Sequence, residues 1–242
     1  MIFNDIVDRK VDAINAPHRP IPTGKISVKT AKIYGCIVAL LALGTALAID
    51  IMNGLYGISV ITVIIFGGSL DLYDIKLKKM GFIGNTIIGL NVIALFVYGT
   101  IHTYLIYGGT FAWVPIVVGV AAGSGNIGRE VIKGLPDIEG DRESGIRTLA
   151  VKYGPRKTAI IGSAFLLVLA IGGSAAAIGG NLYIPSIIVV FLIVALVLFL
   201  IIRIIYNQSP KWAYTTKEIL LLVFLAFLLT FIIDKIVRLA LT

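Results

Sequence analysis

Charged side chains are scarce in this sequence. Asp, Glu, Lys and Arg together make up only 14% of the 242 residues, while hydrophobic residues make up 58%. A soluble domain carries about 25% charged residues, because its surface faces water. The composition therefore argues against a soluble domain and predicts a chain surrounded by lipid. We expect a multi-pass protein of the cell membrane.

Cysteine is nearly absent as well. The single Cys36 lies inside a long hydrophobic run, so the sequence predicts neither a disulfide framework nor a cysteine-based metal site. Nucleotide binding is also disfavoured, although Gly123 to Gly128 matches the pattern GxGxxG. That motif needs a preceding strand and a βαβ unit, which the surrounding sequence does not predict. These glycines are more typical of helix packing, and we expect no nucleic-acid partner.

Long hydrophobic runs, in contrast, are abundant. A helix needs about 20 apolar residues to cross a hydrocarbon core of about 30 Å. The sequence contains seven such runs, at Thr30–Ile49, Leu55–Tyr73, Ile83–Ile101, Phe111–Val131, Thr158–Ile178, Ile184–Ile205 and Ile219–Val237. Small residues such as Gly119 and Gly123 let helices approach closely in lipid. We therefore predict an all-α fold, a seven-span transmembrane bundle with a polar cap, as one domain over residues 1–242.

Lysine and arginine are missing from alternate loops. Residues 50–54, 102–110 and 179–183 contain neither, whereas the segments before the first run and after the second, fourth and sixth are basic. Because basic loops tend to stay in the cytoplasm, this alternation predicts that the cap and the active site face the cytoplasm. Lys235 and Arg238 are the exception, since they lie on the predicted outer side.

A first acidic cluster stands near the start of the chain. Asn4, Asp8 and Asp12 are spaced four residues apart, so a helix would place all three on one face, with Asp5 pointing elsewhere. The cluster offers oxygen ligands without His or Cys. Such sets suit hard cations, and Mg²⁺ commonly binds one or two carboxylates while substrate phosphates complete its shell.

A second acidic cluster, Asp137 and Asp141, repeats the four-residue spacing. Both clusters fall beside predicted cytoplasmic ends of spans, so the bundle can bring them together. The pattern predicts Mg²⁺-assisted handling of a diphosphate. The alternative is that these aspartates are ordinary solvated loop charges. That interpretation is the weaker one, because the protein has few charges and yet carries two spaced acidic clusters on one predicted side.

Basic residues accompany both clusters, as a site for anions requires. Asn126, Arg129, Glu130 and Lys133 form one polar stripe at the end of the fourth span. Ionisable residues at membrane depth usually face an interior cavity and mark function, although headgroup anchoring is the alternative for Arg129 and Lys133. The candidate substrate-binding residues near the clusters are Arg9, Arg19, Arg129, Lys133, Arg142 and Arg147.

Two long stretches resemble motifs of the UbiA-type intramembrane prenyltransferases. Residues 4–27, NDIVDRKVDAINAPHRPIPTGKIS, resemble the family's NDxxDxxxD motif and the RPIP segment after it. Residues 128–154, GREVIKGLPDIEGDRESGIRTLAVKYG, resemble its DxxxD motif followed by GDRxxGxxTLA. The REVIK run is most similar to the archaeal digeranylgeranylglyceryl phosphate synthases.

The resemblance implies an activity and a set of site residues. It implies Mg²⁺-dependent transfer of a geranylgeranyl group from its diphosphate to the hydroxyl of geranylgeranylglyceryl phosphate, in archaeal ether-lipid synthesis. Prenylation of an aromatic or quinone-precursor ring, or of chlorophyllide, stays open as an alternative. The residues implied as catalytic are Asp8, Asp12, Asp137 and Asp141, and these four with Asn4 are the implied metal ligands.

The sequence departs from the family pattern in two places. Family members usually carry two further helices before the first motif, which we expect this chain to lack. The family's YxxxK element is altered, because Leu77 stands four residues after Tyr73, with Lys76 and Lys78 on either side. Tyr73, Lys76 and Lys78 are therefore further candidates for contact with the diphosphate.

A cation-coupled transporter is the rival function from another class. Acidic clusters can also coordinate a cation in transit. A transport site is expected near the bilayer midplane on broken helices, whereas these clusters fall at one predicted face. The sequence therefore favours the enzyme.

Overall fold

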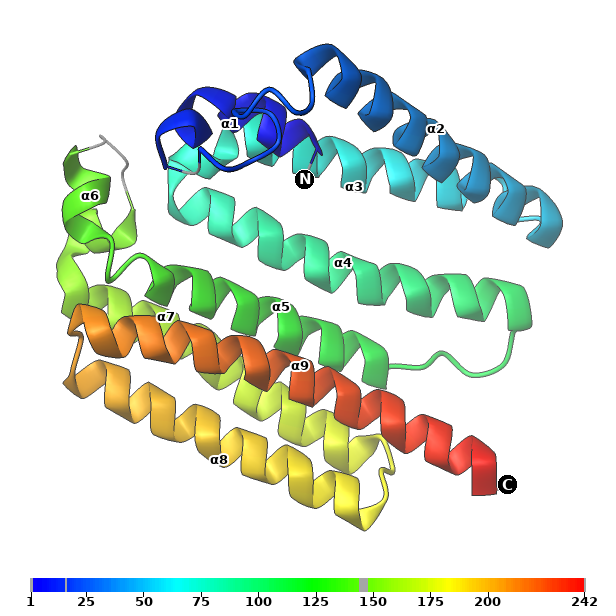
Figure 1. Ribbon diagram of the computed structural model, residues 1–242. Coiled ribbons are helices and arrows are strands. Elements are labelled where there is room, and N and C mark those ends of the chain that lie inside the picture. The colour runs from blue at the N-terminus through cyan, green and yellow to red at the C-terminus, as the bar shows by residue number, and fades with distance from the viewer. Residues whose placement is uncertain (1, 16, 144–147, 242) are drawn as a thin grey trace. The chain divides into compact units, whose positions relative to one another are not determined.

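The computed structural model describes residues 2–15, 17–143 and 148–241, without the side chains of residues 10, 11, 14, 15, 78 and 79. Within those ranges the chain is helical and contains no strand, which confirms the predicted all-α class (Figure 1). In chain order the elements are α1 (Ile2–Asn15), α2 (Val28–Asn53), α3 (Ile58–Ile75), the 3-10 helix η1 (Leu77–Met80), α4 (Phe82–Tyr107), α5 (Val114–Lys133), α6 (Ile138–Glu143), α7 (Leu149–Gly179), α8 (Ile184–Tyr206) and α9 (Pro210–Leu241).

Six of these helices are long and apolar enough to cross a membrane, namely α2, α3, α4, α7, α8 and α9. The predicted span Phe111–Val131 corresponds to α5, which is not one of the six. Its second half carries Gly125, Asn126, Arg129 and Glu130, which lower its apolar character. This helix nonetheless has a largely buried interior stretch, so neighbouring helices rather than lipid surround it.

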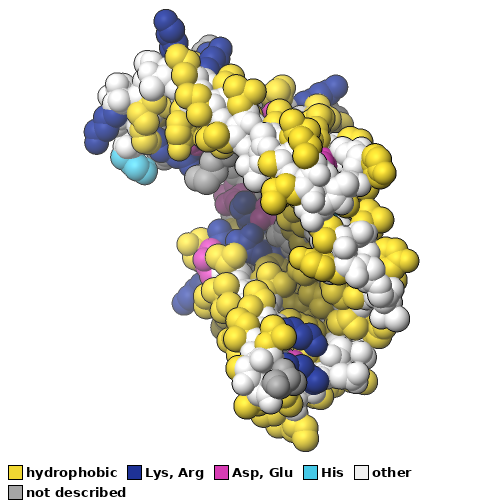
Figure 2. Space-filling view, turned by 90° about the vertical axis from the view of Figure 1, so that its right-hand side faces the viewer, with side chains coloured by type: hydrophobic (Ala, Val, Ile, Leu, Met, Phe, Trp, Pro, Cys, Tyr) yellow, Lys and Arg dark blue, Asp and Glu magenta, His cyan; other side chains and the backbone are white. Residues whose placement is uncertain are grey.

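Large apolar side chains cover much of the molecular surface. Leu40, Ile51, Ile184 and Leu192 are each more than 60% exposed, and Figure 2 shows hydrophobic side chains distributed along the whole face it presents. In water this surface would be strongly unfavourable, whereas lipid tails solvate it without cost. The distribution agrees with a multi-pass membrane protein.

The chain forms two compact units, residues 1–78 and 79–242. In the first, α1 packs against both α2 and α3, which also contact each other. Gly35 of α2 permits this, because a methyl group there would lie 3.2 Å from the Phe3 ring of α1. Between α2 and α3, the buried Asp50 accepts hydrogen bonds from the backbone N–H groups of Ser59 and Val60 at 2.9 and 3.1 Å. Asp50 thereby caps the first turn of α3.

In the second unit, α5 is the central helix and packs against α4, α7 and α9. Glycines allow the close approach. A Cβ atom on Gly123 would lie 2.5 Å from the carbonyl oxygen of Gly89 in α4, and one on Gly128 would lie 2.7 Å from that of Gly162 in α7. The glycines of the GxGxxG pattern, Gly123, Gly125 and Gly128, are therefore buried in α5. Small residues at such positions let neighbouring helices pack closely in lipid.

The far ends of α7 and α9 are joined by polar contacts. Asp234 of α9 is buried and accepts a hydrogen bond from the Tyr183 backbone N–H at 2.8 Å, with Arg238 3.5 Å away. Lys235 donates to the carbonyl oxygen of Gly180 at the end of α7, across 3.2 Å. These contacts account for the two basic residues that do not fit the alternation of loop charge, because both have partners within the protein.

Candidate active site

The first acidic cluster lies on α1, as its spacing predicts. Asp12 is buried, with only 8% of its surface exposed. The Arg19 guanidinium donates from Nη1 to Oδ2 of Asp12 at 2.8 Å and to Oδ1 of Asp5 at 3.2 Å. The expectation that Asp5 points elsewhere is wrong with respect to Asp12. Seven residues make almost two helical turns, so Asp5 and Asp12 share a side of α1.

Arg19 is held in place by a compact turn. The Arg19 carbonyl oxygen accepts from both the backbone N–H and the hydroxyl of Thr23, at 3.0 and 2.9 Å. The Ile26 N–H closes the turn by donating to the Pro20 carbonyl at 3.1 Å, and Gly24 supplies a positive φ of 74°. Ser27 then caps α2 by accepting from the Thr30 N–H at 3.0 Å. The RPIP segment thus fixes an arginine against the acidic helix.

A cavity of about 420 Å³ opens beside this cluster. Asp5, Asp12 and Arg19 contribute its charged lining. The remaining wall is mainly apolar and consists of Ile2, Pro20, Ile21, Pro22, Ile26, Thr30, Ala31 and Tyr34. The first unit therefore places carboxylates at the edge of an apolar chamber.

The other predicted substrate-binding residues of the first unit lie on α1 and at or just after the end of α3. Arg9 donates to the carbonyl oxygen of Ile6 at 2.9 Å, one turn back on its own helix. Tyr73 lies in the last turn of α3, and Lys76 is the exposed residue that ends this helix. The side chain of Lys78 lies outside the described residues.

The second acidic cluster lies at α6, which is a single short helix. Its first turn is closed by a hydrogen bond of 2.8 Å from the Asp141 N–H to the Asp137 carbonyl. Burial raises the pKa of the Asp141 carboxyl; a hydrogen bond from Thr148 opposes this, and the neighbouring Asp137 raises the pKa further. The two carboxylates thus repel each other, which a bound cation would relieve.

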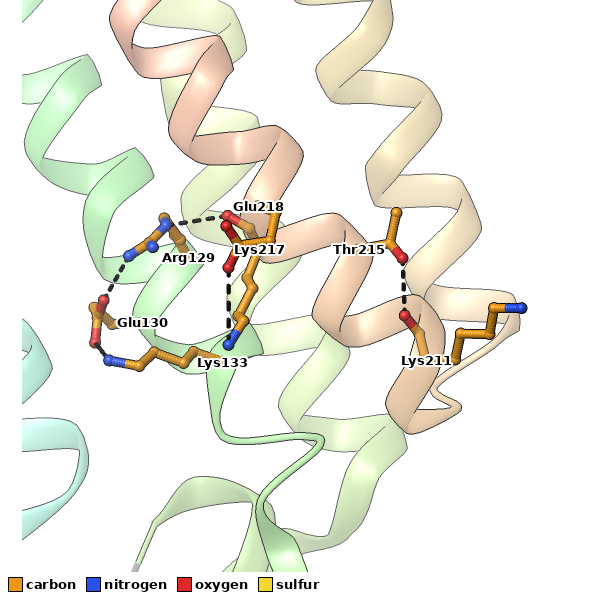
Figure 3. A network of polar contacts seen from close by, with 7 residues as sticks. All are labelled: Arg129, Glu130, Lys133, Lys211, Thr215, Lys217 and Glu218. Atoms are coloured by element: carbon orange, nitrogen blue, oxygen red, sulfur yellow. Dashed lines mark hydrogen bonds and ion pairs between the residues drawn. The ribbon is translucent and has the colours of Figure 1, made fainter. Parts of the chain in front are cut away.

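Beside this cluster, the end of α5 carries a network of ion pairs (Figure 3). Arg129 donates from Nη1 to Oε1 of Glu130 at 2.7 Å, and Lys133 donates to Oε2 of the same residue at 3.3 Å. The Nε of Arg129 donates to the backbone carbonyl of Lys217 in α9, across 3.2 Å. Three residues of the predicted polar stripe, Arg129, Glu130 and Lys133, are therefore connected in one network, which extends onto a second helix.

Lys217 is a candidate that sequence reasoning missed. Its ammonium lies 4.1 Å from the centre of the Tyr214 ring and 3.9 Å from a carboxylate oxygen of Glu218. No sequence pattern connects it to Arg129, because 88 residues separate the two. Among the remaining candidates, Arg142 is exposed in the last turn of α6, and Arg147 lies outside the described residues.

The carboxylate oxygens of the two acidic clusters are suitable ligands for a hard cation that also binds a substrate. Among the described residues, no group of three or more His, Cys, Asp and Glu side chains is placed to hold a metal by itself. Each acidic cluster instead offers carboxylate oxygens in a pair, and in the second pair burial and, to a smaller extent, repulsion by Asp137 raise the pKa of Asp141. Mg²⁺ typically accepts one or two carboxylates and takes its other ligands from phosphate or water. The residues therefore fit Mg²⁺ bound together with a diphosphate.

Residues 1–228 match the sequence profile of the UbiA prenyltransferase family. The digeranylgeranylglyceryl phosphate synthase of Sulfolobus acidocaldarius is 34% identical over 168 residues, or 69% of this chain and 57% of the relative. That of Korarchaeum cryptofilum is 36% identical, over 69% of this chain and 55% of the relative. This chain thus spans just over half the length of these two relatives. The synthase of Methanothermobacter thermautotrophicus is 32% identical over 88% of this chain and 71% of its own length.

Two solved structures share the fold. One, from work on digeranylgeranylglyceryl phosphate synthase in membranes, has a TM-score of 0.77 at 27% identity and covers 96% of this chain and 79% of its own. The other, a UbiA homologue from Aeropyrum pernix, has a TM-score of 0.72 and covers 97% of this chain and 84% of its own. Its 15% identity supports likeness of fold alone.

Proposed function

Because the chain belongs to the UbiA prenyltransferase family, we propose that it is an intramembrane prenyltransferase of archaeal ether-lipid synthesis. The proposed donor is geranylgeranyl diphosphate, and the proposed acceptor is geranylgeranylglyceryl phosphate. The products are digeranylgeranylglyceryl phosphate and pyrophosphate. The observation that carries this proposal is the pair of acidic clusters, each with arginine beside it, in a chain about one third identical to relatives named for that synthesis.

We propose that residues 1–242 act as one catalytic domain. The cluster of Asn4, Asp8 and Asp12 would hold one Mg²⁺, and Asp137 with Asp141 would hold a second. When bound, these ions would neutralise diphosphate oxygens and stabilise the pyrophosphate that leaves. The placement of this site at the cytoplasmic face rests on the alternation of loop charge.

The chain's own residues have three tasks in this reaction. The carboxylates would hold the cations that position the diphosphate, and the basic residues stabilise the charge that develops as the C1–O bond to the diphosphate breaks. Apolar helices exclude water, so that the acceptor hydroxyl rather than water forms the new bond to C1, and its proton passes to the pyrophosphate that leaves. The acceptor's phosphate needs a second cationic subsite, for which Arg19, Arg129, Lys133 and Arg147 are the candidates.

An acceptor comparison tests the substrate assignment. Purified protein in detergent is supplied with geranylgeranyl diphosphate and Mg²⁺, and with either geranylgeranylglyceryl phosphate or a phenolic quinone precursor. We expect the prenylated product from the lipid phosphate to form at least about tenfold faster. Preference for the aromatic acceptor would refute the archaeal-lipid assignment and leave a quinone-type prenyltransferase.

A further inference from the structure

The carboxylate of Glu130 connects two cations that the proposed function assigns to the substrate. Its side chain is only 18% exposed, and its two oxygens accept from different residues. Oε1 accepts from Arg129 at 2.7 Å, and Oε2 accepts from Lys133 at 3.3 Å (Figure 3). A single side chain thereby fixes the separation of a guanidinium and an ammonium group.

Arg129 is restrained from a second direction as well. Its Nε donates to the carbonyl oxygen of Lys217, so α9 holds one edge of the guanidinium while Glu130 holds Nη1. Arginine has five N–H donors in a rigid planar fork. In the part of the chain that the structure describes, no acceptor is recorded for Nη2. The two Nη2 donors therefore point in a direction set by the protein.

The charge of this network suits an anion. Arg129, Lys133 and Lys217 supply three positive charges, while Glu130 and Glu218 supply two negative ones. The network thus keeps a net positive charge, and Lys133, with 49% of its side chain exposed, remains accessible. It also adjoins the second acidic cluster in sequence, because only residues 134–136 separate Lys133 from Asp137.

We propose that Glu130 is a positioning residue, which holds Arg129 and Lys133 as a preorganised clamp for the phosphate monoester of the lipid acceptor. This inference rests on the proposed function for the identity of the anion. Preorganisation lowers the entropy that long side chains lose when a ligand immobilises them. Glu130 itself is not expected to touch the acceptor.

Two simpler roles make different predictions. If Glu130 only balanced charge, its removal would make the site more positive and strengthen anion binding. If it only joined helices, its removal would lower thermal stability and weaken binding of both substrates alike. A positioning role predicts weaker binding of the lipid phosphate alone.

The test compares Glu130→Gln with the matched control Glu218→Gln. Gln is isosteric with Glu, but an NH2 donor replaces one of the two acceptor oxygens, so it cannot accept from Arg129 and Lys133 through separate oxygens. Glu218 is half exposed and belongs to the same network, yet among the described residues its ion pair is with Lys217 alone, at 3.9 Å. The probe is a dialkylglycerol phosphate, whose dissociation constant is measured by equilibrium binding in detergent without turnover.

We expect Glu130→Gln to raise this dissociation constant about tenfold, as two side chains lose their restraint. Glu218→Gln should remain within about twofold of wild type. In assays of turnover, Glu130→Gln should raise the acceptor KM, with kcat and the KM for geranylgeranyl diphosphate nearly unchanged. Arg129→Lys should weaken binding similarly, and the double variant should be no weaker than either single variant, because both changes disrupt one clamp.

Unchanged or tighter binding by Glu130→Gln would overturn the positioning role, and so would a wild-type protein that does not bind the lipid phosphate. Failure of the proposed function looks different. If the wild type binds the probe but transfers no prenyl group to any acceptor, the enzyme assignment fails, while the binding comparison still decides the role of Glu130.

Discussion

Arg19 lies 2.8 Å from a carboxylate oxygen of Asp12, an implied metal ligand. Its guanidinium thus balances the charge of a carboxylate that a divalent cation would also need. The Asp12 side chain is 11% exposed and that of Arg19 is 41% exposed, so water screens the pair in part. An ion pair of this exposure contributes up to about 1 kcal/mol. Arg19 should therefore compete with a metal for Asp12.

Replacing this arginine tests the competition. In Arg19→Gln, Asp12 loses its cationic partner, so Mn²⁺, used as a probe for Mg²⁺, should bind up to about fivefold more tightly. Electron paramagnetic resonance of free Mn²⁺ measures this affinity without turnover. Weaker Mn²⁺ binding in the variant would instead make Arg19 a supporting residue of the metal site.

The acidic clusters should be essential for turnover but not for folding. We expect Asp8→Ala and Asp141→Ala to lower kcat by at least about a hundredfold, because each removes a proposed ligand of the Mg²⁺ that would stabilise the charge of the leaving group. Thermal unfolding in detergent should stay near that of wild type. The matched control is Glu139→Ala, since Glu139 is exposed on α6 between the two aspartates. Activity within twofold of wild type for either aspartate variant would refute the two-metal assignment.

Helix packing around α5 should depend on glycine. Gly123→Ala places a methyl group 2.4 Å from a side-chain carbon of Ile93 and 2.5 Å from the Gly89 carbonyl oxygen, so α4 and α5 must separate. Overpacking of this kind costs about 1–3 kcal/mol. Gly68→Ala is the control, because no atom lies within 4 Å of a Cβ atom there. Equal melting temperatures for the two variants would contradict this packing.

The cytoplasmic orientation of both motifs is open to direct measurement. With the exposed Cys36 replaced by Ala, single cysteines at Lys25 and Arg142 should react with a membrane-impermeant maleimide only in inside-out vesicles. Cysteines at Asn53 and Asn181 should react only in right-side-out vesicles, since the charge alternation places them outside. Opposite sidedness of Lys25 and Arg142 would exclude an active site shared by the two motifs.

Sequence spacing predicted the local features of this site well. Helical periodicity placed Asp12 on α1, and the long apolar runs located the spanning helices. The same periodicity places Asp5 and Asp12, which are seven residues apart, on one side of the helix. The four-residue spacing alone had predicted that Asp5 points elsewhere. The run Phe111–Val131 corresponds to α5, which is not among the six helices that are long and apolar enough to cross a membrane, because its second half carries glycines and polar residues.

Long-range partners could not be predicted in the same way. The bond between Arg129 and the Lys217 carbonyl depends on how α5 packs against α9, and a backbone acceptor leaves no signature in side-chain patterns. The role of Lys235 was likewise hidden, because its acceptor, the carbonyl oxygen of Gly180, lies 55 residues away at the end of α7. Arg238, in contrast, pairs with Asp234 four residues earlier on α9, a local spacing that the sequence itself contains. Local periodicity determines which residues share a helix face, whereas packing determines which faces meet.

Prenyl transfer itself is the central claim, and one measurement tests it most directly. Protein purified in detergent is incubated with radiolabelled geranylgeranyl diphosphate, geranylgeranylglyceryl phosphate and Mg²⁺, and the lipid product and pyrophosphate are quantified together. We predict that both form in a one-to-one ratio, that EDTA abolishes both, and that Asp141→Ala forms neither. Pyrophosphate release without a prenylated lipid, or no reaction with any acceptor, would contradict the account.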